Sequence, residues 1–105
     1  MTHQEFDNIF DETVKKCQSI LNVKKYEYAT EDRLHNFKAA AYVQGITSAV
    51  ALSGMMAKHI ISLFDMLRQP EINWSLETWD EKIIDAINYL ILLRALIKEE
   101  ERIIG

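Results

Sequence analysis

The chain of 105 residues contains one cysteine, one proline and three glycines. A lone cysteine cannot form an internal disulfide, so the fold must be stabilised by its core. Because proline and glycine mark most turns, a chain with so few of them has few places to reverse direction. This scarcity favours a small number of long helices over many short strands. The length suits one domain, residues 1–105.

Runs of basic residues are also missing, and the net charge is −4. Sequence-independent nucleic-acid binding and anionic membrane surfaces both need clustered positive charge, so neither is expected. The longest apolar stretch, residues 83–97, is interrupted by Asp85, Asn88 and Arg94 and is too short and polar to cross a bilayer. The first residues lack a basic segment followed by an apolar one, so no signal peptide is expected. A soluble, cytoplasmic protein is predicted.

Apolar residues recur at helical spacing in four stretches, which predicts an all-α, four-helix bundle-like domain. Thr2 with Glu5, and Thr78 with Glu81, have the spacing of N-terminal capping boxes. Gly45 suits the left-handed position that ends a helix. The expected helices span about 3–21, 31–43, 47–68 and 79–103.

The last predicted helix is apolar on nearly every side between Ile83 and Ile97. Such a helix is usually buried all round, and the other three helices of so small a domain cannot cover it completely. We therefore expect a homo-oligomer, a dimer or a tetramer, joined through this helix. Cys17 lies on the apolar face of the first helix and is expected to be a small buried hydrophobe.

Polar residues interrupt the apolar faces of the last two helices. Glu81, Asp85 and Asn88 follow i, i+4, i+7 spacing, and Lys58 and Asp65 lie on the preceding helix. If the two helices pack antiparallel, these groups approach one another, and buried charges must pair or bind something. One interpretation is a small anionic-ligand or metal–phosphate site. The other is an internal network, in which Lys58 pairs with Asp65 or Asp85 while Asn88 bonds to backbone.

Two residues near the start of the second helix complete the predicted ligand-binding set. Arg33 would join Lys58 on phosphate oxygens, and Asn36 would read the edge of a base, unless it is a plain cap residue. Glu81 and Asp85 are the candidate Mg²⁺ ligands, because Mg²⁺ prefers oxygen ligands and keeps several waters. No catalytic residue is assigned, since the common catalytic motifs are missing.

Two stretches resemble small phage and prophage helical proteins of the MazG-like and nucleotide-modification-associated groups. Residues 25–38 place a tyrosine–alanine element before an Asn-Phe pair, and residues 79–93 place an aspartate three residues ahead of an Asn-Tyr pair. Residues 56–61 resemble the basic helix segment that such proteins carry between them. Together these stretches cover about a third of the chain.

The resemblance implies an oligomeric all-α bundle whose paired acidic motifs bind Mg²⁺ and hydrolyse nucleoside triphosphates to the monophosphate and pyrophosphate. Asp85 would match the final aspartate of the second pair. The chain departs from the pattern at Lys82, where that pair needs an acid, and at Lys58 and His59, where the first pair is expected. The hypothesis that follows is a protein that binds a nucleotide with an incomplete metal site, its catalytic activity left open.

Two other hypotheses remain. A non-enzymatic phage-type helical protein that modulates a host factor would explain the acidic charge and the apolar last helix. An architectural homo-oligomer would use its polar stripe to specify register, as single buried polar residues do in coiled coils.

Overall fold

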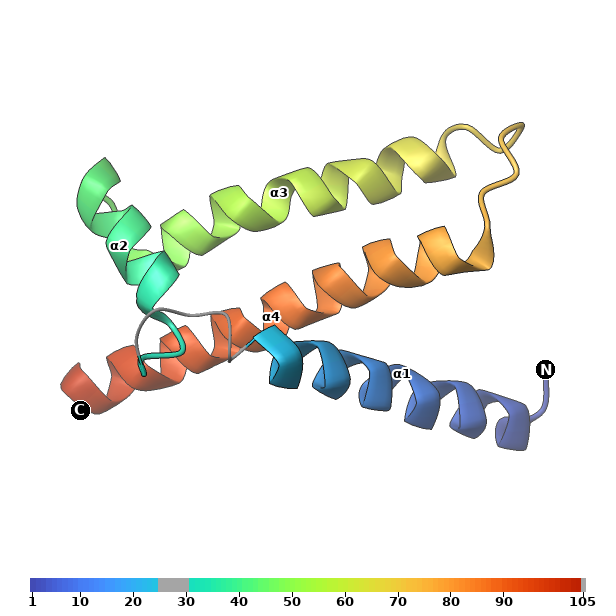
Figure 1. Ribbon diagram of the computed structural model, residues 1–105, viewed down its shortest axis with the longest axis horizontal. Coiled ribbons are helices and arrows are strands. Elements are labelled where there is room, and N and C mark those ends of the chain that lie inside the picture. Colours follow the sequence, from blue (N-terminus) through green and yellow to red (C-terminus); the bar gives the residue numbers. More distant parts are fainter. Residues whose placement is uncertain (25–30, 105) are drawn as a thin grey trace.

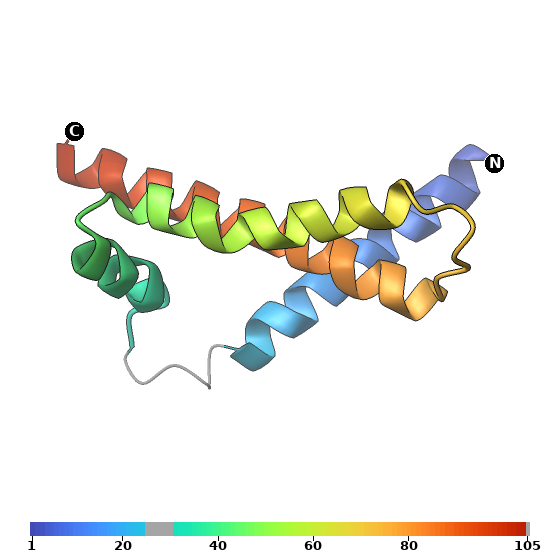
Figure 2. The same ribbon diagram turned by 90° about the horizontal axis from the view of Figure 1, so that it is seen from above.

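The computed structural model describes residues 1–24 and 31–104, with side chains up to residue 100. This part of the chain is all-α and has four helices: α1 (His3–Lys24), α2 (His35–Gln44), α3 (Ser48–Leu67) and α4 (Leu76–Ile104). α3 and α4 form an antiparallel hairpin, α2 packs beside the first turns of α3, and α1 crosses α4 (Figure 1, Figure 2). The predicted fold class is confirmed. The first residues of the 25–38 stretch lie outside the described residues.

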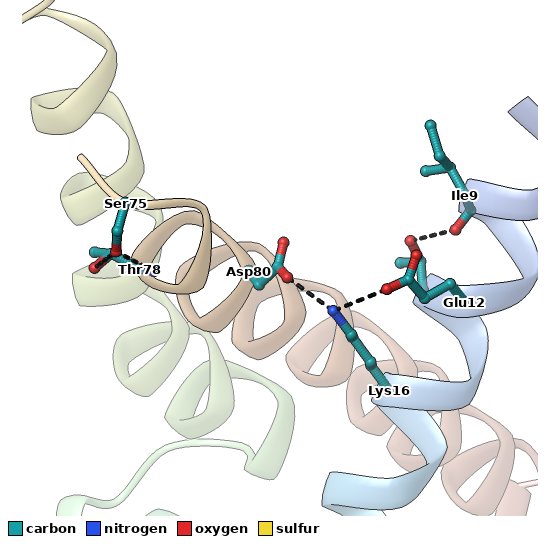
Figure 3. Close-up of polar contacts among 7 residues, drawn as sticks. Ile9, Glu12, Lys16, Ser75, Thr78 and Asp80 are labelled. Atoms are coloured by element: carbon teal, nitrogen blue, oxygen red, sulfur yellow. Dashed lines mark hydrogen bonds and ion pairs between the residues drawn. The ribbon is translucent and has the colours of Figure 1, made fainter. Parts of the chain in front are cut away.

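Side-chain caps explain where three of the helices begin. Thr2 Oγ1 accepts from the Glu5 amide at 3.1 Å while a Glu5 carboxylate oxygen accepts from the Thr2 amide at 2.8 Å, so the first predicted capping box is confirmed. Thr47 caps α3. The prediction for α4 was wrong: the Oγ of Ser75 accepts from the Thr78 amide at 3.1 Å, and the helix begins at Leu76 rather than near residue 79 (Figure 3).

α2 begins at His35, four residues later than predicted. The preceding segment instead forms a turn, in which Asp32 accepts a hydrogen bond from the Leu34 amide at 3.0 Å. The Asp32 carboxylate also pairs with Lys38 at 2.6 Å, and Lys38 reaches Glu99 of α4 at 2.5 Å. The hydrogen bond from Lys38 lowers the pKa of Asp32, and the one to Asp32 raises the pKa of Lys38. This chain of charges connects α2 to the far end of α4.

The core lies where α2, α3 and α4 meet. Leu52 and Leu96 are 0% and 2% exposed, and with Leu34 and Phe37 they form one buried cluster. α2 ends against this cluster because Gly45, at φ 67°, turns the chain in the left-handed region that glycine adopts without strain. The predicted C-cap is therefore confirmed.

α1 lies outside this core and contacts only α4 among the described helices. Cys17 is its one buried residue, as predicted, and burial raises the pKa of the thiol. Lys16 pairs with Glu12 at 3.2 Å and with Asp80 of α4 at 2.8 Å, which fixes the crossing point (Figure 3). The apolar residues Phe6, Ile9, Phe10 and Val14 of α1 are exposed, whereas Ile20 and Leu21 near its end are half-buried.

α3 is the one described helix that is long and apolar enough to cross a membrane by length and composition, over Ser48–Arg68. Its residues Ala51, Leu52 and Met66 are buried within the protein. In all, 17% of this apolar segment is buried within the protein.

Replacement of Leu96 by alanine should lower the free energy of unfolding by about 2–5 kcal/mol, because it leaves a cavity in the main cluster. Urea unfolding followed by circular dichroism measures this change. Tyr42→Ala is the control, since Tyr42 is 90% exposed and its loss should change stability by less than about 0.5 kcal/mol. Equal effects of the two substitutions would contradict the assigned core.

Candidate functional site

A small pocket lies where the end of α1 approaches the other three helices, and its volume is about 120 Å³. We call it the polar pocket. Three of the predicted ligand-binding residues, Asn36, Asp85 and Asn88, converge here from α2 and α4. The remaining lining residues come from all four helices: Leu21, Lys24, Phe37, Met55, Tyr89 and Leu92.

Asn88 is the buried polar residue of the described chain, with 5% of its surface exposed. Its Nδ2 donates to the Cys17 carbonyl of α1 at 3.4 Å, so the predicted bond to backbone is confirmed. Among the described residues, no group donates to its buried Oδ1. A buried acceptor left without a donor costs about 1–3 kcal/mol, and such atoms are rare in folded proteins. This oxygen is therefore a buried acceptor without a described donor, on a residue that lines the pocket.

Asp85 lies one helical turn before Asn88 and brings a carboxylate to the same pocket. Its Oδ2 is 3.7 Å from Nδ1 of His59 on α3, which is an ion pair only when the imidazole is protonated. That distance is too long for a hydrogen bond, so the carboxylate keeps capacity to accept one. The His59 ring also contacts the Tyr89 ring, with centroids 5.0 Å apart. His59 thus faces the Asp85 carboxylate from α3, and its ring packs against Tyr89 of α4.

The other predicted site residues lie elsewhere. Lys58 and Asp65 are exposed on α3, and neither lines the polar pocket. The ion pair predicted between Lys58 and Asp85 is not the one observed, because the described partner of Asp85 is His59. Arg33 donates through Nη2 to the Leu21 carbonyl and so connects the turn before α2 to α1. The structure does not bring these three side chains together as a phosphate-binding group.

The two predicted Mg²⁺ ligands, Glu81 and Asp85, line different pockets of the protein surface. Glu81 is exposed and lines a shallow surface between α1 and α4 together with Lys16 and Asp80, whereas Asp85 lines the polar pocket. The described residues contain no group of three or more His, Cys, Asp or Glu side chains placed to hold a metal ion. Binding of Mg²⁺ by Glu81 and Asp85 stays a prediction from the sequence.

Sequence reasoning missed two polar groups of the pocket. Lys24 was missed because the first helix was expected to end near Leu21, and α1 continues one turn further. Tyr89 directly follows Asn88 and lies four residues after Asp85, so helical spacing alone could have placed it beside that carboxylate. Met55 carried no signal that distinguishes it from an ordinary core residue.

No family model, curated protein or solved structure matches the chain. The resemblance to MazG-like and nucleotide-modification-associated proteins therefore stays a prediction. The interpretation of the polar pocket rests on its own geometry.

Replacement of Asn88 by leucine should leave the free energy of unfolding unchanged or raise it by about 1–2 kcal/mol. The substitution removes an unpartnered buried acceptor and loses only one long hydrogen bond. Thermal and urea unfolding measure the change. A decrease of more than about 1 kcal/mol in the free energy of unfolding would contradict this prediction. It would show that Asn88 stabilises the fold and that its Oδ1 does not destabilise the protein without a ligand.

Proposed function

We propose that the chain binds a nucleotide, with the base in the polar pocket and the sugar and phosphates outside it. The observation that carries this proposal is the buried, unpartnered Oδ1 of Asn88 beside the carboxylate of Asp85. Nucleobases present ring N–H and amino groups along their edges, and amide and carboxylate oxygens accept from them. A base bound here would satisfy an acceptor that the fold leaves free.

The volume of the pocket sets the size of the bound group. Whole drug-sized ligands occupy pockets of about 300–1,000 Å³, and the polar pocket measures about 120 Å³. It therefore suits one flat ring system and excludes an entire nucleoside triphosphate. Sugar and phosphates would extend past the mouth, where Lys24 is the positively charged residue of the lining.

The walls also suit a base. Phe37 and Tyr89 bring aromatic rings to the pocket, and such side chains stack on unpaired bases. The Asn36 amide offers both a donor and an acceptor at the same pocket. Because the two remaining groups, Asp85 and Asn88 Oδ1, are acceptors, bases that carry an amino group should bind more tightly than thymine.

Binding is the part of the hypothesis that the geometry supports. The described residues offer no three-ligand metal group, so hydrolysis stays a prediction from the family resemblance. The alternative of a non-enzymatic helical protein that works by association is supported by a different feature, the exposed apolar side chains of α1 and α4. Modulation of a host factor remains a hypothesis drawn from the resemblance.

A matched pair of aspartate variants tests nucleotide binding. Thermal-shift and calorimetric titrations with nucleoside mono- and triphosphates, with and without Mg²⁺, should show binding to the unmodified chain. At a hundred times its Kd, a ligand adds about 2.7 kcal/mol of stability. Asp85→Asn should abolish the response because it replaces an acceptor oxygen with a donor, whereas Asp65→Asn, exposed on α3, should keep it.

Free bases provide the control for the orientation of the ligand. They should compete with the nucleotide, because the proposed contacts are to the base. The proposal fails if no nucleotide shifts the transition, or if Asp65→Asn and Asp85→Asn lose the response equally.

A further inference from the structure

The polar pocket presents hydrogen-bond acceptors at two depths. Asn88 is 5% exposed, and its Oδ1 has no donor among the described residues. The Asp85 side chain is 23% exposed and lies three residues earlier on α4, which places it beside Asn88 on the helix surface. An ionised carboxylate only accepts hydrogen bonds, and its two oxygens can take two donors side by side. The pocket therefore asks for a ligand with several adjacent donors.

The contact with α1 fixes which atom of the Asn88 amide the ligand meets. Nδ2 donates to the Cys17 carbonyl at 3.4 Å. A carbonyl oxygen can only accept, so the reversed amide would lose this bond and set two oxygens against each other. Oδ1 is thus held as an acceptor. A ligand that leaves it without a donor forgoes the binding energy that a partnered buried acceptor would contribute.

Asn36 adds a donor at the outer part of the pocket. It is the second residue of α2, lines the polar pocket and is exposed. Its Nδ2 can donate to an acceptor of the ligand. From the interior outwards, the pocket therefore presents the Asn88 oxygen, the Asp85 carboxylate and the Asn36 amide, an order of two acceptors followed by a donor.

Among the common bases, guanine has the edge that matches this order. Its N2 amino group and its ring N1–H are adjacent donors, and O6 beside them is an acceptor. In adenine and cytosine the ring nitrogens next to the amino group are acceptors, so one of them would face a carboxylate oxygen. Thymine and uracil have a single ring N–H between two carbonyl oxygens on this edge.

We propose that the polar pocket selects guanine, an inference that rests on the nucleotide binding proposed above. The N2 amino group donates one hydrogen to Asn88 Oδ1 and the other to Asp85. N1–H donates to the second Asp85 oxygen, and O6 accepts from Asn36. Every polar atom on this edge of the base then has a partner, and so does the buried oxygen that the fold leaves without one.

The phosphates contribute little to this selection. Lys24, the positively charged residue of the lining, is exposed at the last position of α1. An exposed ion pair of this kind changes affinity by about 5-fold or less. Because the base carries the recognition, nucleoside monophosphates are sufficient probes of it.

A series of monophosphates, titrated calorimetrically into the full chain, tests the assignment. GMP should bind about 5- to 150-fold more tightly than AMP, CMP or UMP. IMP keeps N1–H and O6 but lacks the amino group, and 2-aminopurine riboside monophosphate keeps the amino group but lacks N1–H. Each should bind at least about 5-fold more weakly than GMP, because each leaves an acceptor of the pocket without a donor.

Two asparagine variants separate the contact with the amino group from the contact with O6. Asn88→Leu should bring the affinities for GMP and IMP to within about 2-fold of each other, because the oxygen that distinguishes them is gone. Asn36→Leu is the matched control. It should weaken GMP and IMP alike, since both carry O6, and keep their ratio within about 2-fold of the original. Circular dichroism checks that both variants keep their helices.

The possible failures are distinguishable. Equal affinities for GMP, AMP and CMP, with the response still lost in Asp85→Asn, would overturn the guanine assignment and leave nucleotide binding in place. The assignment is also overturned if IMP binds as tightly as GMP, or if Asn88→Leu keeps the original ratio. A chain that responds to no nucleotide would overturn both this inference and the proposed function.

Discussion

The packing of α1 across α4 shapes the polar pocket and an apolar groove beside it. Within the described residues α4 is the one helix that α1 contacts, and Arg33 of the turn before α2 donates to the Leu21 carbonyl near the end of α1. Cys17 is buried at the crossing, Asn88 donates to its carbonyl, and Lys16 reaches Asp80 one turn from the start of α4. On one side of this crossing the end of α1 closes the polar pocket. Beside this crossing α1 and α4 border an apolar groove, which Phe6 and Phe10 of α1 and Ile91 of α4 line.

Asn88 belongs to the crossing and to the pocket at once. Its Nδ2 donates a hydrogen bond to the Cys17 carbonyl of α1, while its Oδ1 has no donor among the described residues. A residue selected for packing alone would be apolar at this position, since an apolar group avoids the cost of the unpaired atom. The buried cluster around Leu52 and Leu96, which borders the pocket through Phe37 and Leu92, is the core that stabilises the fold.

Helical periodicity and caps were enough to predict the fold class and the approximate helices. The cap of α1 by Thr2 and Glu5 and the end of α2 at Gly45 are confirmed. In both places the neighbouring sequence offers no second residue of the same capping type. The start of α4 was misassigned because Ser75 and Thr78 can both cap a helix, and only tertiary packing decides between them. The same limit applies to α1, whose apolar stripe predicts a covered face but cannot say whether this chain or another covers it.

For the site, spacing along a single helix was more informative than spacing between helices. Asp85 and Asn88 were placed together correctly because one helix carries both. Lys58 was predicted to face them, but neighbouring residues on a helix point about 100° apart, and it is His59 that reaches Asp85. The rotation of α3 about its own axis depends on its packing against α2 and α4. The sequence of α3 alone, apolar on several sides, does not specify that rotation.

The side-chain amide resonances of the asparagines test the central claim most directly. In a ¹H–¹⁵N correlation spectrum, addition of a nucleotide should shift the side-chain NH₂ signals of Asn88 and Asn36, because both line the polar pocket. The signal of Asn8, which lies on exposed α1 and accepts from Gln4, should stay in place. Unchanged Asn88 and Asn36 signals at saturating nucleotide would contradict the account.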